Sequence, residues 1–482
     1  MLYNSLDPTS LSQHLALYEL YPNHIMGKKA LQDACQLLYG KNNLISSVNA
    51  FPLSNSAIHA VINLVNKDGN KETPSLPEVE LVEFFKLSRL LPHYQLKGHH
   101  VWQEKEVWEL PAEQIDLARA LFLSQFESDK GRIATYEAQI DLMALQVLAR
   151  LPKGASDEEK ISAINTLIFD EMEFRFPPHS LHTKDIDVYT FLPSVIDSHR
   201  GVCLGVSILY LCLAQRLDLK LEMVTPPGHI YVRHQGKNKI TNIETTARGI
   251  HLNCESYLGV NVKSLQQRTI KEVIGLAHFN QASLYLQDGS FEKAYQAYQK
   301  CRPYLPSDPL LKELTGYVCL LTERLSQGEL LLNEMKNYIP EYAVKGSSLA
   351  EDYLNGRVNC EGIALLFSRT EENRAALLEK KEMLEQLLIV YPRFRTGLLQ
   401  LAMTWLKLHR MGEAMEVLQA YHQLDPDDPE TNYYLAILSI HRLDYLKAWN
   451  HLRQIEGLLH QCGHQVKDVK ELRQMLTKKS PE

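Results

Sequence analysis

Several features that would place the chain in a special class are scarce in its 482 residues. No run of about 18 apolar residues occurs, and the N-terminus lacks a basic segment followed by an apolar core. The sequence therefore predicts a soluble cytoplasmic protein with no membrane contact. A basic excess is also missing, because 51 Lys and Arg stand against 58 Asp and Glu, a net charge of −7. This balance argues against nucleic acid as the main partner.

Cysteine is present but not clustered. The eight cysteines form no C-x-x-C pair, so they indicate neither a disulfide framework nor a structural zinc site, and their scattered positions are typical of a reducing compartment. His93, His99 and His100 are close in sequence but show neither helical spacing nor a carboxylate partner, so we interpret them as surface histidines rather than metal ligands. No Asp-rich loop suggests a calcium site.

A 34-residue repeat occupies the C-terminal part of the chain. Residues 275–308 carry small residues at the eighth and twentieth positions, Ala282 and Ala294, and the same register returns in 395–428 and 429–462. Small residues at these positions let two helices approach closely, while larger side chains fill the space to the next repeat. The pattern resembles the tetratricopeptide (TPR) repeat over all 34 positions. It predicts an α-solenoid.

Prolines mark two weaker repeats between the clear ones. Pro340 follows Pro306 by 34 residues, and Pro392 precedes Pro426 by 34. The 52 residues from Pro340 to Pro392 exceed one repeat by 18, so we expect an insertion or an irregular helix near residues 347–362.

The rest of the sequence predicts helices and one hairpin. Residues 7–10 form a helix-start motif, and residues 110–174 have the apolar spacing of three amphipathic helices. After a polar loop, an apolar stretch following Gly201 predicts a buried helix. Residues 221–247 are rich in β-branched and aromatic residues around a turn at 235–238, which predicts an antiparallel hairpin.

Three residues of this central segment have the order that a cysteine acyl-transfer enzyme needs. Cys203 begins the predicted buried helix, whose N-terminus favours a thiolate. His229 and Glu244 follow on successive predicted strands, where the imidazole can accept the thiol proton and the carboxylate can orient the ring. Asn242 is the weaker alternative to Glu244. This chemistry needs no cofactor and no metal.

The segment also carries a family resemblance. Arg200-Gly201, the apolar helix that follows and Pro227-Gly228-His229 resemble the core of the SirB-type transglutaminase-like family, whose domain is commonly followed by TPR-like repeats. Many SirB-type sequences have Pro where this chain has Cys203. The Gly-x-Cys turn instead resembles that of the wider transglutaminase and papain-like superfamily, in which Asp is usual at the position of Glu244.

The resemblance covers roughly residues 105–462, and together with the predicted helices before it the sequence predicts an α+β protein in three parts. These are a mainly helical region of unknown role at 1–105, a transglutaminase-like domain at 106–265 and a TPR-like domain at 266–482. The leading hypothesis is an enzyme of acyl transfer or amide hydrolysis, while the alternative is a TPR scaffold with an inactive transglutaminase-like domain. A third hypothesis is that the protein is a regulator that acts through the transcription machinery, and it rests on family association alone. We expect the TPR groove to bind a protein partner through polar residues, namely Asn280, Gln281, Gln400, Asn432 and Tyr433.

Overall fold

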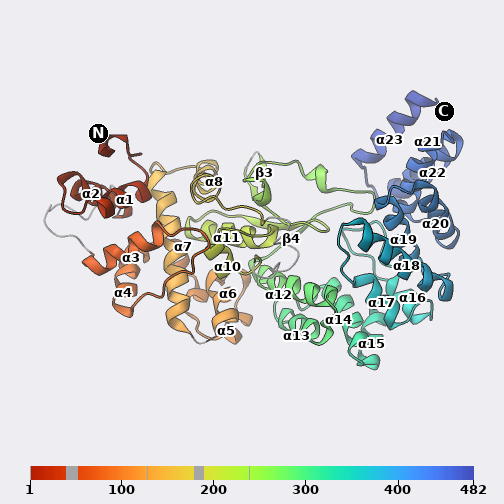
Figure 1. Ribbon diagram of the computed structural model, residues 1–482, viewed down its shortest axis with the longest axis horizontal. Helices are drawn as coiled ribbons and strands as arrows, with labels where there is room; N and C mark the ends of the chain where they lie inside the picture. The colour runs from red at the N-terminus through yellow and green to blue at the C-terminus, as the bar shows by residue number, and fades with distance from the viewer. Residues whose placement is uncertain (1, 40–52, 128, 178–188, 238, 482) are drawn as a thin grey trace. The chain divides into compact units, whose positions relative to one another are not determined.

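The computed structural model describes residues 2–39, 53–127, 129–177, 189–237 and 239–481. The fold is α+β, as the sequence predicts: it is mostly helical and contains one small sheet (Figure 1). The chain divides into two compact units. The first comprises Met1–Thr225, His229–Leu252 and Gln267–Ala277, and the second comprises Pro226–Gly228, Asn253–Gln266 and His278–Glu482. The three-part division at residues 105 and 265 stays a prediction.

The first unit is mainly helical. Its α-helices are α1 (Leu11–Leu20), α2 (Ile25–Tyr39), α3 (Asn55–Val65), α4 (Glu78–Ser88), α5 (Glu104–Trp108), α6 (Leu117–Phe126), α7 (Lys130–Arg150), α8 (Asp157–Asn165), α10 (Leu192–Ser198) and α11 (Cys203–Arg216). Shorter helical segments are η1 (Leu2–Ser5), η2 (Pro92–Gln95), η3 (Lys97–His100), η4 (Ala112–Gln114), η5 (Thr166–Glu171) and η6 (Thr245–Ala247).

Side-chain caps explain where several of these helices begin. The Ser10 hydroxyl accepts a hydrogen bond from the backbone N–H of Gln13, so the predicted helix start at 7–10 is confirmed. The three helices expected in 110–174 are α6, α7 and α8, the last continuing into η5. Ser156 and Glu159 form a reciprocal capping box at the start of α8.

The sheet has four strands in the order β3-β2-β1-β4. They are β1 (Glu222–Thr225), β2 (Tyr231–Gln235), β3 (Ile240–Ile243) and β4 (Gln266–Arg268). The predicted hairpin is confirmed, since β2 pairs antiparallel with β3 and Val232 lies opposite Ile243. One residue of its predicted turn, 238, and most of the predicted loop, 178–188, lie outside the described residues. The buried helix α11 packs on β2.

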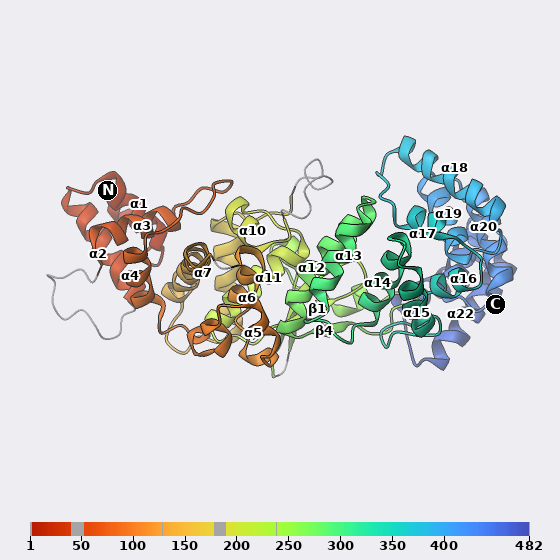
Figure 2. The same cartoon turned by 90° about the horizontal axis from the view of Figure 1, so that it is seen from below.

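Helix pairs form the second unit (Figure 2). Its helical segments are η7 (Cys254–Tyr257), α12 (Ile270–Gln287, shared with the first unit), α13 (Phe291–Cys301), α14 (Pro309–Leu321), α15 (Leu325–Met335), α16 (Leu349–Leu354), α17 (Cys360–Phe367), α18 (Arg374–Val390), α19 (Arg395–Lys407), α20 (Met411–Leu424), α21 (Pro429–His441), α22 (Tyr445–Gln461) and α23 (Lys467–Lys479). The expected irregular region near 347–362 contains the short helices α16 and α17. The clear repeats correspond to α12–α13, α19–α20 and α21–α22.

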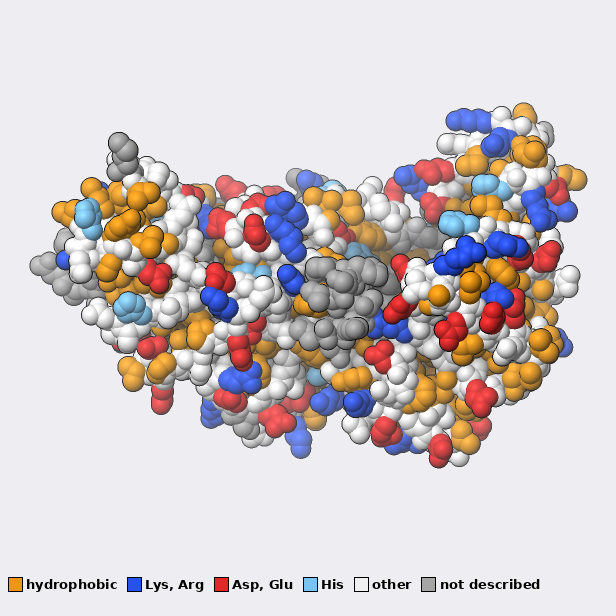
Figure 3. Space-filling model, viewed as in Figure 1, with side chains coloured by type: hydrophobic (Ala, Val, Ile, Leu, Met, Phe, Trp, Pro, Cys, Tyr) orange, Lys and Arg blue, Asp and Glu red, His pale blue; other side chains and the backbone are white. Residues whose placement is uncertain are grey.

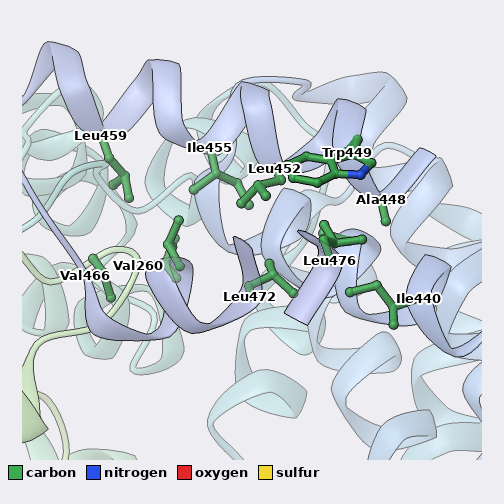
Figure 4. Close-up of a cluster of buried hydrophobic side chains, with 12 residues drawn as sticks. Val260, Ile440, Ala448, Trp449, Leu452, Ile455, Leu459, Val466, Leu472 and Leu476 are labelled. Atoms are coloured by element: carbon green, nitrogen blue, oxygen red, sulfur yellow. The ribbon is translucent and has the colours of Figure 1, made fainter. Parts of the chain in front are cut away.

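The repeat register predicts the close contacts of these pairs correctly. The alanines at the eighth and twentieth positions of all three clear repeats are fully buried: Ala282, Ala294, Ala402, Ala414, Ala436 and Ala448. In the last repeat, Ala448 and Trp449 belong to a core that also contains Val260, contributed by the segment before α12 (Figure 4). Val260 is therefore part of the solenoid core, although it precedes the repeats in sequence.

Two of the three histidines expected at the surface are buried, which corrects that expectation. His93 is fully buried and His99 nearly so, because η2 packs against α11 and η3 packs against α6, whereas His100 is exposed. The missing carboxylate partner is supplied by Asp116, whose Oδ2 lies 2.8 Å from His99 Nδ1.

The surface is mixed in charge. Acidic and basic side chains are interspersed over the face drawn in Figure 3, in keeping with the small net charge. Within the described ranges, no helix combines the length and the apolarity that crossing a bilayer requires.

Candidate functional site

Cys203 is the first residue of α11, where unpaired backbone N–H groups and the positive end of the helix dipole lie. Two glycines set its position by allowing close packing. A Cβ on Gly205 would lie 2.4 Å from the carbonyl oxygen of Tyr189, and a Cβ on Gly201 would lie 2.7 Å from Val206 Cγ2. The start of α11 is therefore pressed against the segment that leads into α10. The Cys203 side chain is partly exposed.

His229 precedes β2 and points to both predicted partners. The turn before it uses Gly228 at φ +73°, a conformation that favours glycine. His229 Nε2 lies 2.8 Å from Glu244 Oε2, which leaves Nδ1 as the ring nitrogen for the hydrogen bond with Cys203. The hydrogen bond with Cys203 and then that with Glu244 raise the pKa of His229 to about 10, against the opposing effect of burial. The imidazole therefore holds its proton at neutral pH.

Glu244 directly follows β3, and both its carboxylate and its backbone N–H are hydrogen-bonded. Its side chain is about 4% exposed. While Oε2 meets His229, Oε1 accepts a hydrogen bond from the Thr246 hydroxyl at 3.0 Å. Its backbone N–H donates to the carbonyl oxygen of Ile250 at 3.0 Å. Both carboxylate oxygens thus have partners, which fixes the direction in which the carboxylate faces the imidazole.

Asn242 does not contact His229. Its Oδ1 accepts a hydrogen bond from Arg233 Nε at 3.0 Å, and its Nδ2 donates to the carbonyl oxygen of Leu252 at 2.7 Å. Both functions of the amide are used within the hairpin. Of the two residues that could orient the imidazole, the structure places Glu244 there.

Two residues of the site were missed by the sequence reasoning. The Ser207 hydroxyl in α11 lies 3.0 Å from the Thr245 hydroxyl in η6, and Thr245 Oγ1 also lies 3.5 Å from the carbonyl oxygen of Cys203. These contacts join the helix of the cysteine to the turn that follows the glutamate. Nothing in the local sequence marks Ser207 or Thr245, because the pairing depends on how α11 packs on the hairpin.

The residues expected to bind a partner lie in the second unit and differ in their burial. Tyr433 lines a cavity of about 660 Å³ in the solenoid, and Gln400 is exposed. Asn280 and Gln281 are half-buried in α12 and are not among the residues that line this cavity. The expectation for Asn432 is wrong, because its side chain is fully buried and donates to the carbonyl oxygens of Pro426 and Asp428.

Comparison with known proteins supports the prediction of a transglutaminase-like domain in the central part of the chain. Residues 134–272 match the sequence profile described as the transglutaminase-like superfamily. This range contains Cys203, His229 and Glu244, whereas most of the helical N-terminal region and most of the solenoid lie outside it. No curated protein matches the chain.

Three solved structures are similar to part of the chain. MamA (residues 41 to the end) from Desulfovibrio magneticus RS-1 is 16% identical, with a TM-score of 0.18 over 39% of this chain and 96% of that one. Pseudomonas aeruginosa PilF is 19% identical, with a TM-score of 0.23 over 42% and 83%. A thermophilic TPR protein of Thermus thermophilus is 20% identical, with a TM-score of 0.21 over 42% and 98%. The assignment of the solenoid rests on its own helix pairs and buried alanines.

Proposed function

We propose that the chain is a cysteine enzyme of acyl transfer or amide hydrolysis, of the SirB type, in which Cys203, His229 and Glu244 act as a triad. The observation that carries this proposal is the position of His229, which hydrogen-bonds Cys203 and places Nε2 2.8 Å from a buried, doubly held carboxylate. A free thiol suits this chemistry, and all eight cysteines are free of disulfides.

The chemistry follows from the geometry. The Cys203 sulfur attacks the acyl carbon and forms a thioester, and the leaving amine takes a proton from His229. Water or an amine then attacks the thioester and loses its proton to His229, which releases the product and restores the thiolate–imidazolium pair. Glu244 keeps the ring in one orientation and stabilises the imidazolium.

A labelling experiment tests the site without a known substrate. Iodoacetamide at a limiting dose and neutral pH should modify Cys203 before the other seven cysteines, as read by peptide mass spectrometry. Cys462 is an internal control because it is the exposed cysteine and carries no such partner in the proposal. The preference should be lost in His229→Ala and reduced in Glu244→Gln, with Asn242→Ala as the matched variant that leaves the triad intact.

Labelling of Cys462 or Cys254 ahead of Cys203 in the folded protein would reject a reactive cysteine. If an activity is found, Cys203→Ala should abolish it, while Glu244→Gln should leave a residual rate because orientation is only part of the catalytic effect.

The second candidate is a non-catalytic scaffold in which the solenoid binds a protein partner. The cavity of about 660 Å³ in the second unit favours it, since Tyr433 and Tyr434 line it beside Asp428 and Glu430. Binding of a partner by the solenoid is compatible with either candidate, so it does not by itself decide between them. Binding retained in Cys203→Ala, together with an unreactive Cys203 in the original chain, would favour the scaffold alone.

A further inference from the structure

A second group of polar residues in the first unit lies outside the proposed triad. His93 comes from η2, His99 from η3, and Asp116 caps the N-terminus of α6. One ligand atom from each of the three lies within 4.8 Å of the other two. All three side chains are buried. They also precede residues 134–272, so the match to the transglutaminase-like profile does not cover them.

Two arginines lie near this group, and each is hydrogen-bonded to a carboxylate other than Asp116. Arg119 Nη2 donates to Glu137 at 2.7 Å, and Arg216 Nε donates to Asp141 at 2.6 Å. Each of these arginines therefore has its own carboxylate.

Asp116, by contrast, receives its hydrogen bonds from the His99 ring and from the backbone N–H of Arg119. It is fully buried, so its negative charge calls for a nearby cation. Arg216 attracts it from a distance but is hydrogen-bonded to Asp141. A metal ion or a proton on His99 would supply the missing positive charge.

His93 points to a metal ion rather than to a proton. Its side chain is 0% exposed, and neither ring nitrogen has a hydrogen-bond partner among the described residues, although Nε2 lies 3.3 Å from Asp141 Oδ1. An unsatisfied buried nitrogen costs free energy that a bond to a metal ion would recover.

We propose that His93, His99 and Asp116 bind a divalent transition metal ion, for which Zn²⁺ is the best fit. Two imidazoles and one carboxylate are ligands that Zn²⁺ accepts in tetrahedral sites, with a fourth position for water. Bonds of about 2.0–2.2 Å place the ligand atoms on such an ion about 3–4 Å apart, which atoms already within 4.8 Å reach through small shifts. His99 also lines a cavity of about 340 Å³, which provides a route for the ion and for water.

The bound ion would join η2, η3 and α6, which otherwise meet through noncovalent contacts. Its effect would be on the stability of the first unit, and it takes no part in the chemistry proposed at Cys203. The inference therefore does not depend on the proposed function, and either can fail alone.

Cobalt binding is the direct test. The full chain carrying Cys203→Ala is freed of metal with a chelator and titrated with Co²⁺, a visible probe of Zn²⁺ sites. Removing the Cys203 thiol excludes a metal site at the triad. We expect one equivalent of Co²⁺ with the strong visible bands of a tetrahedral site, without the sulfur-to-cobalt charge-transfer band of cysteine ligation, and full displacement by Zn²⁺.

Two variants and one matched control locate the ion. Asp116→Asn removes the charge but keeps a side chain that caps α6 equally well, and His93→Gln removes a second ligand. Each should weaken Co²⁺ binding at least about 100-fold, since even outer-shell partners of a metal site contribute 10- to 100-fold. His100→Gln alters the exposed neighbour and should bind as the parent does. Circular dichroism shows which variants are folded.

The parent protein alone can overturn the proposal, so no variant has to fold for the test to decide. Folded parent that develops no visible bands at saturating Co²⁺ would show that His99 and Asp116 form a proton-bridged pair instead. Cobalt binding of undiminished affinity in folded Asp116→Asn would place the ion elsewhere and reject the assignment. Zn²⁺ should also raise the unfolding temperature of the parent but not that of Asp116→Asn.

Discussion

The hydroxyl of Ser207 lies 3.0 Å from the hydroxyl of Thr245, and both are buried. This hydrogen bond joins the second turn of α11 to η6, so it fixes the helix that carries Cys203 relative to the turn that follows Glu244. A contact of this kind holds reactive groups in place without touching a substrate.

Removing both partners of this pair should cost less than the sum of the two single removals. Ser207→Ala leaves a buried hydroxyl on Thr245 with only its long contact to the Cys203 carbonyl, which should cost about 1–3 kcal/mol of unfolding free energy. Thr245→Val should cost a similar amount, and the double variant should cost less than the sum. Urea unfolding of the four proteins measures the coupling. Additive effects would mean that the hydrogen bond contributes nothing to stability.

Gly205 should tolerate no side chain. An alanine Cβ there would lie 2.4 Å from the Tyr189 carbonyl oxygen and 2.8 Å from Val195 Cγ2, so α11 must move. We expect Gly205→Ala to lower the unfolding free energy by about 1–3 kcal/mol and to slow the labelling of Cys203.

The matched control is Gly457→Ala in α22. No atom lies within 4 Å of the added Cβ, and alanine favours helix by about 1 kcal/mol over glycine, so this variant should be as stable as the parent or more stable. A stable, fully reactive Gly205→Ala protein would contradict the packing described at the start of α11.

The sequence predicts the parts of the structure that depend on local spacing. The buried alanines of the solenoid recur every 34 residues, because each repeat packs the same way, so burial of Ala402 or Ala436 can be read from the register alone. The antiparallel hairpin is similarly local. Cys203 at a helix start and His229 before a strand follow from the same kind of pattern, supported by a family resemblance.

Contacts that depend on the ends of elements were not predictable. Residues two apart on a strand share a face, so the sequence alone lets Asn242 and Glu244 compete for His229. In the structure β3 ends at Ile243, so Asn242 pairs across the hairpin with Arg233 while Glu244 turns toward the imidazole beyond the strand.

The burial of His93 also escaped the sequence reasoning. It depends on irregular turns, η2 and η3, that have no periodicity. The meeting of His99 with Asp116, 17 residues later, could not be seen for the same reason.

Asn432 should matter for stability rather than for partner binding. Its amide donates to two backbone carbonyls at 2.7 and 2.9 Å, and its Oδ1 lies 2.8 Å from His451 Nδ1. Asn432→Ala should therefore lower the unfolding free energy by about 1–3 kcal/mol. The exposed Gln400 is the matched control, and Gln400→Ala should change the unfolding free energy by less than about 0.5 kcal/mol. Equal stability of the two variants would contradict the buried role of Asn432.

The contribution of His229 to stability should depend on pH in a defined direction. The pKa of His229 rises from 6.5 to about 10 on folding, so the folded chain binds this proton more tightly than the unfolded chain does. The stabilisation is fully present below pH 6.5 and is lost as the pH rises toward 10. The loss of unfolding free energy in His229→Gln should therefore be largest near pH 6 and should shrink steadily as the pH approaches 10.

Denaturant unfolding at several pH values measures the difference in unfolding free energy between the original chain and His229→Gln. Groups that titrate alike in both proteins cancel in this difference. Glu244→Gln provides a graded test, because it removes one of the two hydrogen bonds that raise the pKa of His229 and leaves the one with Cys203. In that background the effect of His229→Gln should fade at a lower pH. A difference that stays constant from pH 6 to pH 10 would mean that the imidazole is not held as a cation between Cys203 and Glu244, and would remove the electrostatic basis of the triad.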